Sequence, residues 1–470
     1  MPSKPGKIAS NTGKITSQQC DIPNVIEQSD VQSDVQPAIS PDAQMMDSDD
    51  SPVSLDVAME RPLCEVGGDR RYVLATLRAA DLNHAKPRPP LAVAFALDRS
   101  GSMRGHKLRL TCEAVRVALR HLQPTDAFAL VVFDGEVDVL TELCLATPAA
   151  LEQAGRTLDQ VEARGNTALY AGWHQAATLL QRGAAALVPT DAVRRVVLLT
   201  DGEANAGPSS PAELRAAAAQ MAQTGVVTTT LGVGHGFAEE LLAGMAAAGH
   251  GQFHFAQAAD DLPRIMGLEV GEAASVVARQ VVLRCVAAPG VRVRCVSAFA
   301  VQTDANRLDI AVGDLRARQE LMVLVEANVA EPGAASRLEF SLLDRDGELP
   351  LPVVGVQWQR GSAEAVRNQP LDAALAGRVA DRLAAEGLVA MTEDNRRHDF
   401  RAVTRRWEQL RTTLTELGAH LPAVAQVLRE ASDKAAKLAR EMDEMERKGS
   451  YHAAMMRSKS RSPDGSSREY

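Results

Sequence analysis

Three oxygen-bearing side chains follow the end of a short apolar run. Residues 91–97 read LAVAFAL, and Asp98, Ser100 and Ser102 then occupy alternate positions. A carboxylate and two hydroxyls are hard oxygen donors, which suit Mg²⁺, Mn²⁺ or Ca²⁺ and suit zinc or copper poorly. Gly101 permits the tight backbone path that would turn the three side chains toward one point. This spacing therefore indicates binding of a divalent cation.

The apolar run predicts the strand that would position this loop. A bounded run that contains Val and Phe is typical of a strand buried on both faces, as in a parallel sheet. Ligands of open α/β sheets bind at the carboxyl ends of the strands, which is where the loop would lie. The alternative is an ordinary turn in which Asp98 or Ser100 caps the next helix, because these residue types are also common in turns.

Two later stretches add donors of the same kind. Residues 165–167 read GNT and open a helical pattern, which places the hydroxyl of Thr167 at a helix start. Residues 194–202 read RRVVLLTDG and repeat the arrangement of a strand followed by an aspartate, here Asp201. The sequence thus offers two carboxylates and three hydroxyls for one site.

With these pieces the chain resembles the von Willebrand factor A domain and its metal-ion-dependent adhesion site. The family motif D-x-S-x-S falls on Asp98, Ser100 and Ser102, its separate threonine on Thr167 and its distal aspartate on Asp201. The resemblance covers roughly residues 90–270 and is greatest to intracellular bacterial members and to the inter-alpha-trypsin inhibitor heavy chains. It implies a Rossmann-like, doubly wound and mostly parallel sheet.

The resemblance also implies how the site would work. Ser100, Ser102 and either Thr167 or Asp98 would coordinate the cation directly, and Asp201 would often act through water. Two carboxylates at most balance a divalent cation, and octahedral Mg²⁺ keeps water where protein ligands are missing. A Glu or Asp carboxylate of a partner protein would replace that water. We therefore expect a metal-dependent protein-binding module, an adaptor or assembly factor, and not an enzyme.

Two other interpretations use the same residues. A Mg²⁺-dependent hydrolase would need a general base within reach, and Glu203, His106 and His174 lie near the motifs but are more easily surface residues. A metal-free scaffold with a vestigial loop is the third interpretation. Nucleophile-elbow and Walker A motifs are missing from the sequence, and the glycines of residues 232–236 indicate a plain turn.

Composition limits the function further. The chain has 470 residues, 46% of them apolar and only 3% aromatic, so we expect two or three units with cores of Ala, Leu and Val. A net charge of -9 argues against a general nucleic-acid binder. We find no secretory signal, no membrane span and no metal-type spacing among the six cysteines. These features predict a cytoplasmic protein with reduced thiols; they leave the partner and the oligomeric state open.

Changes in periodicity divide the chain into six expected parts. These are a disordered tail (1–51), a β-hairpin (52–89), the A domain (90–278), an antiparallel sandwich-like domain (279–362), a helical region (363–448) and a second disordered tail (449–470). The hairpin should join the sandwich, since a two-stranded hairpin is marginal alone. We expect helix breaks near residues 386–387, 395–399 and 418–422. The helices could form a bundle, a coiled-coil-like pair for a partner, or a hairpin that packs on the sandwich.

Overall fold

The computed structural model describes seven stretches of the chain, which are residues 51–65, 69–81, 88–202, 207–330, 336–345, 347–349 and 351–462. They belong to one compact unit that begins at Ser48. The first expected tail, apart from Ser51, and residues 463–470 of the second lie outside the described residues.

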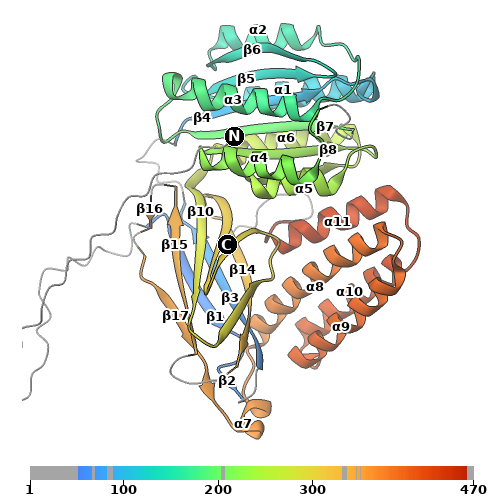
Figure 1. Cartoon of the computed structure of the whole chain (residues 1–470). Coiled ribbons are helices and arrows are strands. Elements are labelled where there is room, and N and C mark those ends of the chain that lie inside the picture. The colour runs from blue at the N-terminus through green and yellow to red at the C-terminus, as the bar shows by residue number, and fades with distance from the viewer. Residues whose placement is uncertain are drawn as a thin grey trace, which may run out of the picture. The chain divides into compact units, whose positions relative to one another are not determined.

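A six-stranded sheet carries the predicted site loops (Figure 1). Its order is β6 (Val137–Leu145), β5 (Ala127–Phe133), β4 (Leu91–Asp98), β7 (Val193–Thr200), β8 (Val226–Val233) and β9 (His250–Ala256). All neighbours are parallel except β5 and β6. Every residue of β4, β5, β7 and β8 is buried, as expected for a sheet covered on both faces. The expected fold class is confirmed.

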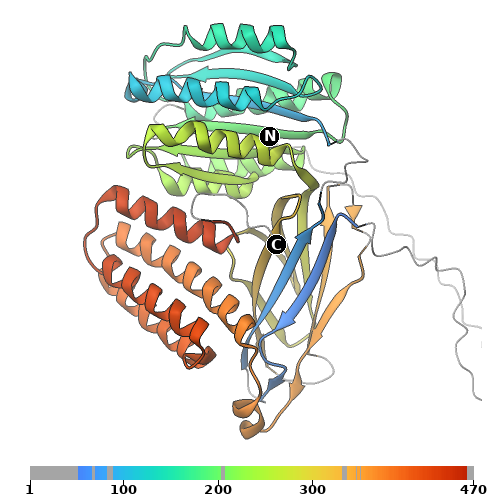
Figure 2. The same cartoon turned by 180° about the vertical axis from the view of Figure 1, so that it is seen from behind.

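Helices cover both faces of this sheet (Figures 1 and 2). One face packs against α1 (His106–Arg120), α2 (Pro148–Leu158) and α6 (Leu262–Ala273). The other face packs against α3 (Leu169–Leu187), α4 (Pro211–Gln223) and α5 (Glu239–Ala248). The sequence pattern predicts a helix over residues 148–163, but α2 ends at Leu158, and residues 159–168 form the loop that carries Thr167.

Two antiparallel sheets form the sandwich around a second apolar core. The first sheet contains β1 (Val53–Met59), β3 (Asp69–Ala79), β14 (Glu320–Val329) and β11 (Val291–Cys295). The second contains β12 (Ala300–Asp304), β13 (Arg307–Arg316), β10 (Val276–Ala287), β15 (Arg337–Asp344), β16 (Gly347–Glu348) and β17 (Val354–Gln357). Strand β3 pairs with β14 along its length, so the early hairpin does join the later strands.

Three short elements lie at one end of the sandwich, at the bottom of Figure 1. Strands β2 (Leu63–Cys64) and β18 (Gln359–Arg360) pair in parallel, and α7 (Ala363–Asn368) follows.

Two boundaries of the sandwich differ from those expected. The last A-domain helix ends at Ala273 and β10 already begins at Val276, so the chain turns into the sandwich before residue 278. The alternation of residues 291–300 predicts a single strand, but the structure has two strands here, β11 and β12, which lie in different sheets. Alternation alone cannot show such a crossing, because both halves keep a period of two.

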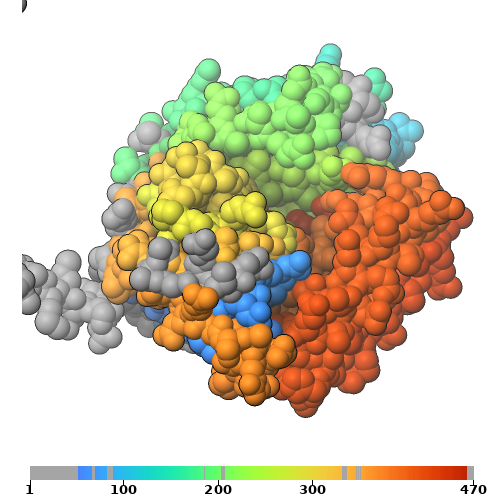
Figure 3. Space-filling view, turned by 60° about the horizontal axis from the view of Figure 1, so that its bottom comes forward, coloured from blue at the N-terminus to red at the C-terminus, as the bar shows by residue number. Residues whose placement is uncertain are grey.

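Four helices follow the sandwich: α8 (Ala373–Arg396), α9 (Phe400–Gly418), α10 (Pro422–Leu438) and α11 (Glu444–Ser458). Asp399, a residue type that favours helix N-termini, caps α9, and its carboxylate accepts from the backbone N–H of Ala402 at 2.9 Å. Tyr72 and Leu74 of β3 share an apolar cluster with α8, α9 and α10. The helices therefore pack on the outer face of the sandwich, and Figure 3 shows them (orange to red) also lying against the A domain (green).

Two expectations for the helices were wrong. Helix α8 runs through Gly387, where a Cβ would lie 2.8 Å from Leu410 Cδ2; this glycine permits close packing of α9 rather than a break. The chain beyond residue 448 is not simply a tail, since α11 continues to Ser458. Among the described residues, no helix has both the length and the apolar character that a bilayer crossing requires.

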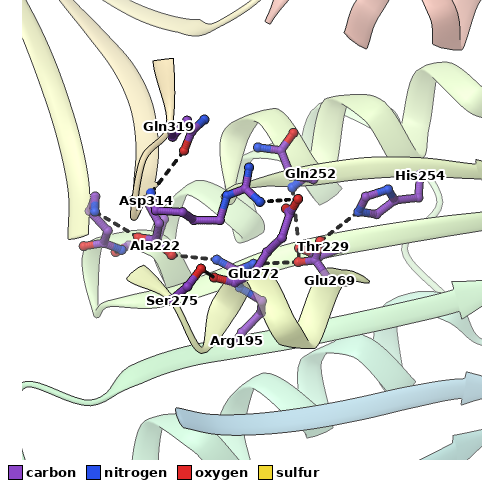
Figure 4. Close-up of polar contacts among 12 residues, drawn as sticks. Arg195, Ala222, Thr229, Gln252, His254, Glu269, Glu272, Ser275, Asp314 and Gln319 are labelled. Atoms are coloured by element: carbon purple, nitrogen blue, oxygen red, sulfur yellow. Dashed lines mark hydrogen bonds and ion pairs between the residues drawn. The ribbon is translucent and has the colours of Figure 1, made fainter. Parts of the chain in front are cut away.

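A buried polar network joins the A domain to the sandwich (Figure 4). Arg195 of β7 donates to Glu269 of α6 and to Asp314 of β13, each at 2.6 Å. Glu269 also lies 2.8 Å from His254 Nε2. Burial would raise the pKa of Glu269, but Arg195 and His254 hold it well below its usual value. Arg195 thus links the two domains, because its buried guanidinium group binds Glu269 of the A domain and Asp314 of the sandwich.

Candidate functional site

The five predicted donors come from three loops at one edge of the sheet. Strand β4 ends at Asp98, and a short 3-10 turn (Gly101–Met103) carries Ser102 into α1. The neighbouring parallel strand β7 ends at Thr200, directly before Asp201. Thr167 lies immediately before α3. Parallel pairing of β4 and β7 brings the first two loops to the same edge.

Hydrogen bonds join the first two loops. Ser102 Oγ donates to Asp201 Oδ1 at 2.5 Å and lies 3.1 Å from Ser100 Oγ. The backbone N–H of Ser100 donates to Asp98 Oδ1 at 2.7 Å. The two carboxylates and two serine hydroxyls therefore form one continuous group.

Thr167 faces the same point. A Cβ placed on Gly202 would lie 3.5 Å from Thr167 Oγ1 and 3.9 Å from both Asp98 Oδ2 and Ser102 Oγ. Three oxygen atoms from two loops thus lie around Gly202 of the third loop, at a position that glycine leaves open. The structure brings all five predicted residues together.

Burial and charge favour a cation at this position. Asp98 and Asp201 are 0% and 1% exposed, whereas Ser102 is exposed, so the site opens on the side of Ser102. Burial raises the pKa of Asp98, hydrogen bonds from Thr200 and Ser100 oppose this, and the Asp201 charge adds to the rise. Lys107 Nζ lies 2.5 Å from Asp201 Oδ2 and offsets one of the two charges.

The donor set matches a hard divalent ion. The described residues contain no group of three or more His, Cys, Asp or Glu side chains placed for a metal. The site instead offers two carboxylates and three hydroxyls, which are all oxygen donors of the kind that Mg²⁺ and Mn²⁺ prefer. The residues therefore fit such an ion, with coordination positions left for water or a ligand.

Thr200 supports the site and escaped sequence reasoning. Its hydroxyl donates to Asp98 Oδ2 at 2.5 Å and accepts from the backbone N–H of Gly202 at 3.1 Å. Its place at the end of β7, immediately before Asp201, is the signal that could have revealed it, because strand ends at this edge face the site.

Asp134 holds the Thr167 loop. Its carbonyl accepts from the backbone N–H of Ala168 at 2.6 Å, and its carboxylate accepts from Arg99 Nε and Arg164 Nε at 2.7 Å each. Burial alone would raise the pKa of Asp134, but the hydrogen bonds from Arg164, Glu136 and Arg99 hold it below its usual value. The residue follows β5 at the same sheet edge, which was its signal in the sequence.

Two of the three residues considered as a hydrolytic base, His106 and His174, have partners other than the five donors. His106 Nε2 lies 3.4 Å from Asp260 Oδ1, and the His174 ring stacks on Tyr170 at 5.4 Å between centroids. Glu203 lies outside the described residues. In the glycine-rich turn of residues 232–236, a Cβ on Gly236 would lie 2.7 Å from the Asp201 carbonyl oxygen, so this turn packs directly behind the site.

Comparisons with known proteins agree with this geometry. Residues 92–267 match the family model for the von Willebrand factor type A domain. Human inter-alpha-trypsin inhibitor heavy chain H3 is 32% identical over 167 residues, which are 35% of this chain and 19% of that protein. Mouse inter alpha-trypsin inhibitor heavy chain 4 is 36% identical over 121 residues, 25% of this chain and 13% of that protein. The chain thus spans less than a fifth of either relative.

Solved structures share more of the architecture. A von Willebrand factor type A protein from Catenulispora acidiphila has a TM-score of 0.61 at 19% identity, covering 83% of this chain and 89% of that one. The ArnB paralog VWA2 from Sulfolobus acidocaldarius has a TM-score of 0.54 at 15% identity, covering 83% and 96%. The similarity extends beyond the A domain to most of the fold.

Proposed function

We propose that the von Willebrand factor type A domain of this chain, residues 92–267, is a divalent-metal-dependent protein-binding module that captures an acidic side chain of a partner. One observation carries the proposal: two buried carboxylates and three hydroxyls from three loops form one group, in which Ser102 is hydrogen-bonded to Asp201 and Thr167, Asp98 and Ser102 lie around Gly202. The inter-alpha-trypsin inhibitor relatives share this domain.

The five residues would have different roles in binding the cation. Ser100, Ser102 and Thr167 would hold Mg²⁺ or Mn²⁺ without adding charge, while Asp98 and Asp201 supply two negative charges. The bound ion supplies an electrophilic centre for an incoming carboxylate. Ser102 is the exposed member, so a partner would approach from its side. Asp201 bonds to Ser102 and would fix the geometry even when it acts through water.

Charge near the opening favours an acidic partner. Arg104 and Arg109 are exposed and line a groove that begins two residues after Ser102. Leu108, Cys112 and Leu158 form apolar parts of its wall. Neither arginine forms an ion pair with a carboxylate of the described residues, and Arg109 Nη2 lies 2.8 Å from His106 Nδ1. Asp159 and Glu162 also line the groove, and Asp159 is paired with Arg116. The proposed role of adaptor or assembly factor follows from this open, charged edge.

Metal binding is tested by titrating Mn²⁺ into the full chain in a calorimeter. The wild type should bind one ion, and Asp98→Ala should bind at least tenfold more weakly. Asp191→Ala, which changes an exposed aspartate outside the site, should behave as the wild type. Equal binding by wild type and Asp98→Ala would refute the proposal.

Carboxylate capture needs a second measurement. Acetate is the probe, and the relaxation of its methyl protons by protein-bound Mn²⁺ reports its approach. The wild type loaded with Mn²⁺ should relax acetate more strongly than it relaxes methanol, which carries no charge. Equal relaxation of acetate and methanol would show that the bound ion does not recognise a carboxylate. Turnover of p-nitrophenyl phosphate that disappears in Asp98→Ala would favour the hydrolase instead.

A further inference from the structure

Lys448 of α11 is buried against the A domain although it lies far from that domain in the sequence. Its side chain is 2% exposed, and Nζ donates to the carbonyl oxygens of His235 and, at 2.7 Å, Phe237. The ammonium group lies 4.1 Å from the centre of the Phe237 ring and 2.9 Å from Glu444. A buried ammonium group requires such partners, so this contact is specific.

The carbonyl groups that Lys448 binds belong to the turn behind the metal site. A Cβ on Gly236, between the two acceptor residues, would lie 2.7 Å from the Asp201 carbonyl oxygen. Backbone therefore touches backbone at this point, with no side chain between them. The same turn passes Lys107, since a Cβ on Gly234 would lie 3.9 Å from Lys107 Nζ.

Asp201 connects this turn to the other proposed metal ligands. Its carboxylate accepts from Ser102 Oγ and lies against Lys107 Nζ, both at 2.5 Å. A continuous series of contacts thus runs from Lys448 through the turn of residues 234–237 to Asp201 and Ser102. A shift of this turn would move the main chain of a proposed metal ligand.

The rest of α11 packs on the A domain through apolar contacts. Tyr451, Met455 and Met456 belong to the same core cluster as the sheet and α5. The His452 ring lies 5.7 Å from the ring of Phe253, on edge strand β9. Helix α11 also packs along α8, so the helical bundle and the A domain both hold it.

The end of α11 is tied to the sandwich as well. Ser458 Oγ accepts from the backbone N–H of Ala298 at 2.8 Å, and Ser460 Oγ accepts from that of Met322 at 2.9 Å. Arg461 donates to Glu272 of α6 at 3.0 Å. Helix α11 thus contacts the sandwich, α8 of the bundle and the turn behind Asp201.

We propose that Lys448 is a positioning residue for the metal site, and that docking of α11 on the A domain and cation binding stabilise each other. The inference rests on the proposed function, since it needs the cation. Coupling of two binding equilibria is reciprocal and is commonly about 5–150-fold. A partner that withdraws α11 would therefore weaken the metal site, and with it the capture of an acidic ligand.

Hydrogen exchange tests one direction of the coupling in the full chain. Saturating Mn²⁺ should slow amide exchange in α11 and in residues 234–237 of the wild type, but not in Asp98→Ala. Exchange in α9, which packs on α8 and α10, should not change. Mn²⁺ binding that leaves α11 exchange unaltered would overturn this inference alone. A wild type that binds no Mn²⁺ would overturn the proposed function as well.

Substitution tests the other direction. Lys448→Met keeps the length of the side chain and removes its charge, and we expect it to lower Mn²⁺ affinity at least fivefold. Arg405→Met is the control, because it removes a positive charge from an exposed position on α9, and it should leave affinity unchanged. Exchange of α11 reports whether the helix has undocked. Undocking with wild-type Mn²⁺ affinity would contradict the proposal.

A variant in the turn of residues 234–237 tests the contribution of the turn while Lys448 is unchanged. Gly236→Ala places a methyl group against the Asp201 carbonyl, so the turn must move while Lys448 stays intact. We expect weaker Mn²⁺ binding together with faster exchange of α11. Unchanged affinity in this variant would show that the turn does not support the site.

Discussion

Thr200 Oγ1 donates a 2.5 Å hydrogen bond to Asp98 Oδ2, so the last residue of one core strand fixes the first proposed ligand at the end of its neighbour. Both residues are fully buried. The carboxylate is thereby oriented before any cation arrives, which lowers the cost of assembling the site.

Thr200→Val should therefore weaken Mn²⁺ binding while preserving the shape of the core. The valine lacks the hydroxyl, and the Asp98 carboxylate loses its partner. We expect a decrease in affinity of about 10–100-fold, as for other supporting groups of metal sites. Calorimetric titration measures it, and Thr200→Ser should restore most of the affinity. Wild-type affinity in Thr200→Val would show that the hydrogen bond has no such role.

Asp134→Asn should destabilise the fold and loosen the Thr167 loop. The carboxylate is buried and accepts from Arg99 and Arg164. Loss of a partner from a buried ion pair costs about 3–5 kcal/mol, but Arg164 is half-exposed, so we expect about 2 kcal/mol. Urea unfolding measures the change, and Glu162→Gln, an exposed neighbour, is the control. A shift no larger than that of the control would contradict the role given to Asp134.

His452 should make stability depend on pH. Burial, with the nearby His254 charge, lowers the pKa of its imidazole from 6.5 to about 3. The unfolded chain binds this proton below about pH 6.5 and the folded chain does not until about pH 3. Stability is therefore lost as the pH falls through that range, by up to about 1.4 kcal/mol per pH unit.

His452→Phe should flatten this dependence, because the phenyl ring stays uncharged between Phe253 and Phe255. Urea unfolding at pH 7.5 and pH 5.5 should show a loss that is about 1 kcal/mol smaller in the variant than in the wild type. His420→Gln changes an exposed histidine and should keep the wild-type slope. Identical slopes in all three proteins would be incompatible with a neutral His452.

The fold of the A domain and its site loop could be predicted from the sequence because the patterns that indicate them are local. An apolar run of strand length, ended by Asp98 and the two serines, determines the loop, and alternating strands and helices determine the sheet. The meeting of Thr167 with this loop required the order of the strands, which the family resemblance supplied. The metal ligands and the cytoplasmic location stay predictions.

The missed features depend on contacts between distant segments. Residues 449–458 read GSYHAAMMRS and follow a charge-dense run, and nothing local shows that Tyr451 and Met455 pack on the A domain. Gly387 looks like a helix break, but its role is to admit Leu410 of α9. Lys448 looks like a solvent-exposed lysine in the sequence, and only the carbonyl groups of residues 235 and 237 explain its burial.

Anomalous diffraction from a crystal soaked in Mn²⁺ tests the central claim most directly. We expect one strong peak about 2.0–2.3 Å from the oxygens of Ser100, Ser102 and either Thr167 or Asp98, with a coordination position open on the side of Ser102. A crystal of Asp98→Ala should lack the peak. A peak elsewhere on the chain, or none between the three loops at saturating Mn²⁺, would contradict the account.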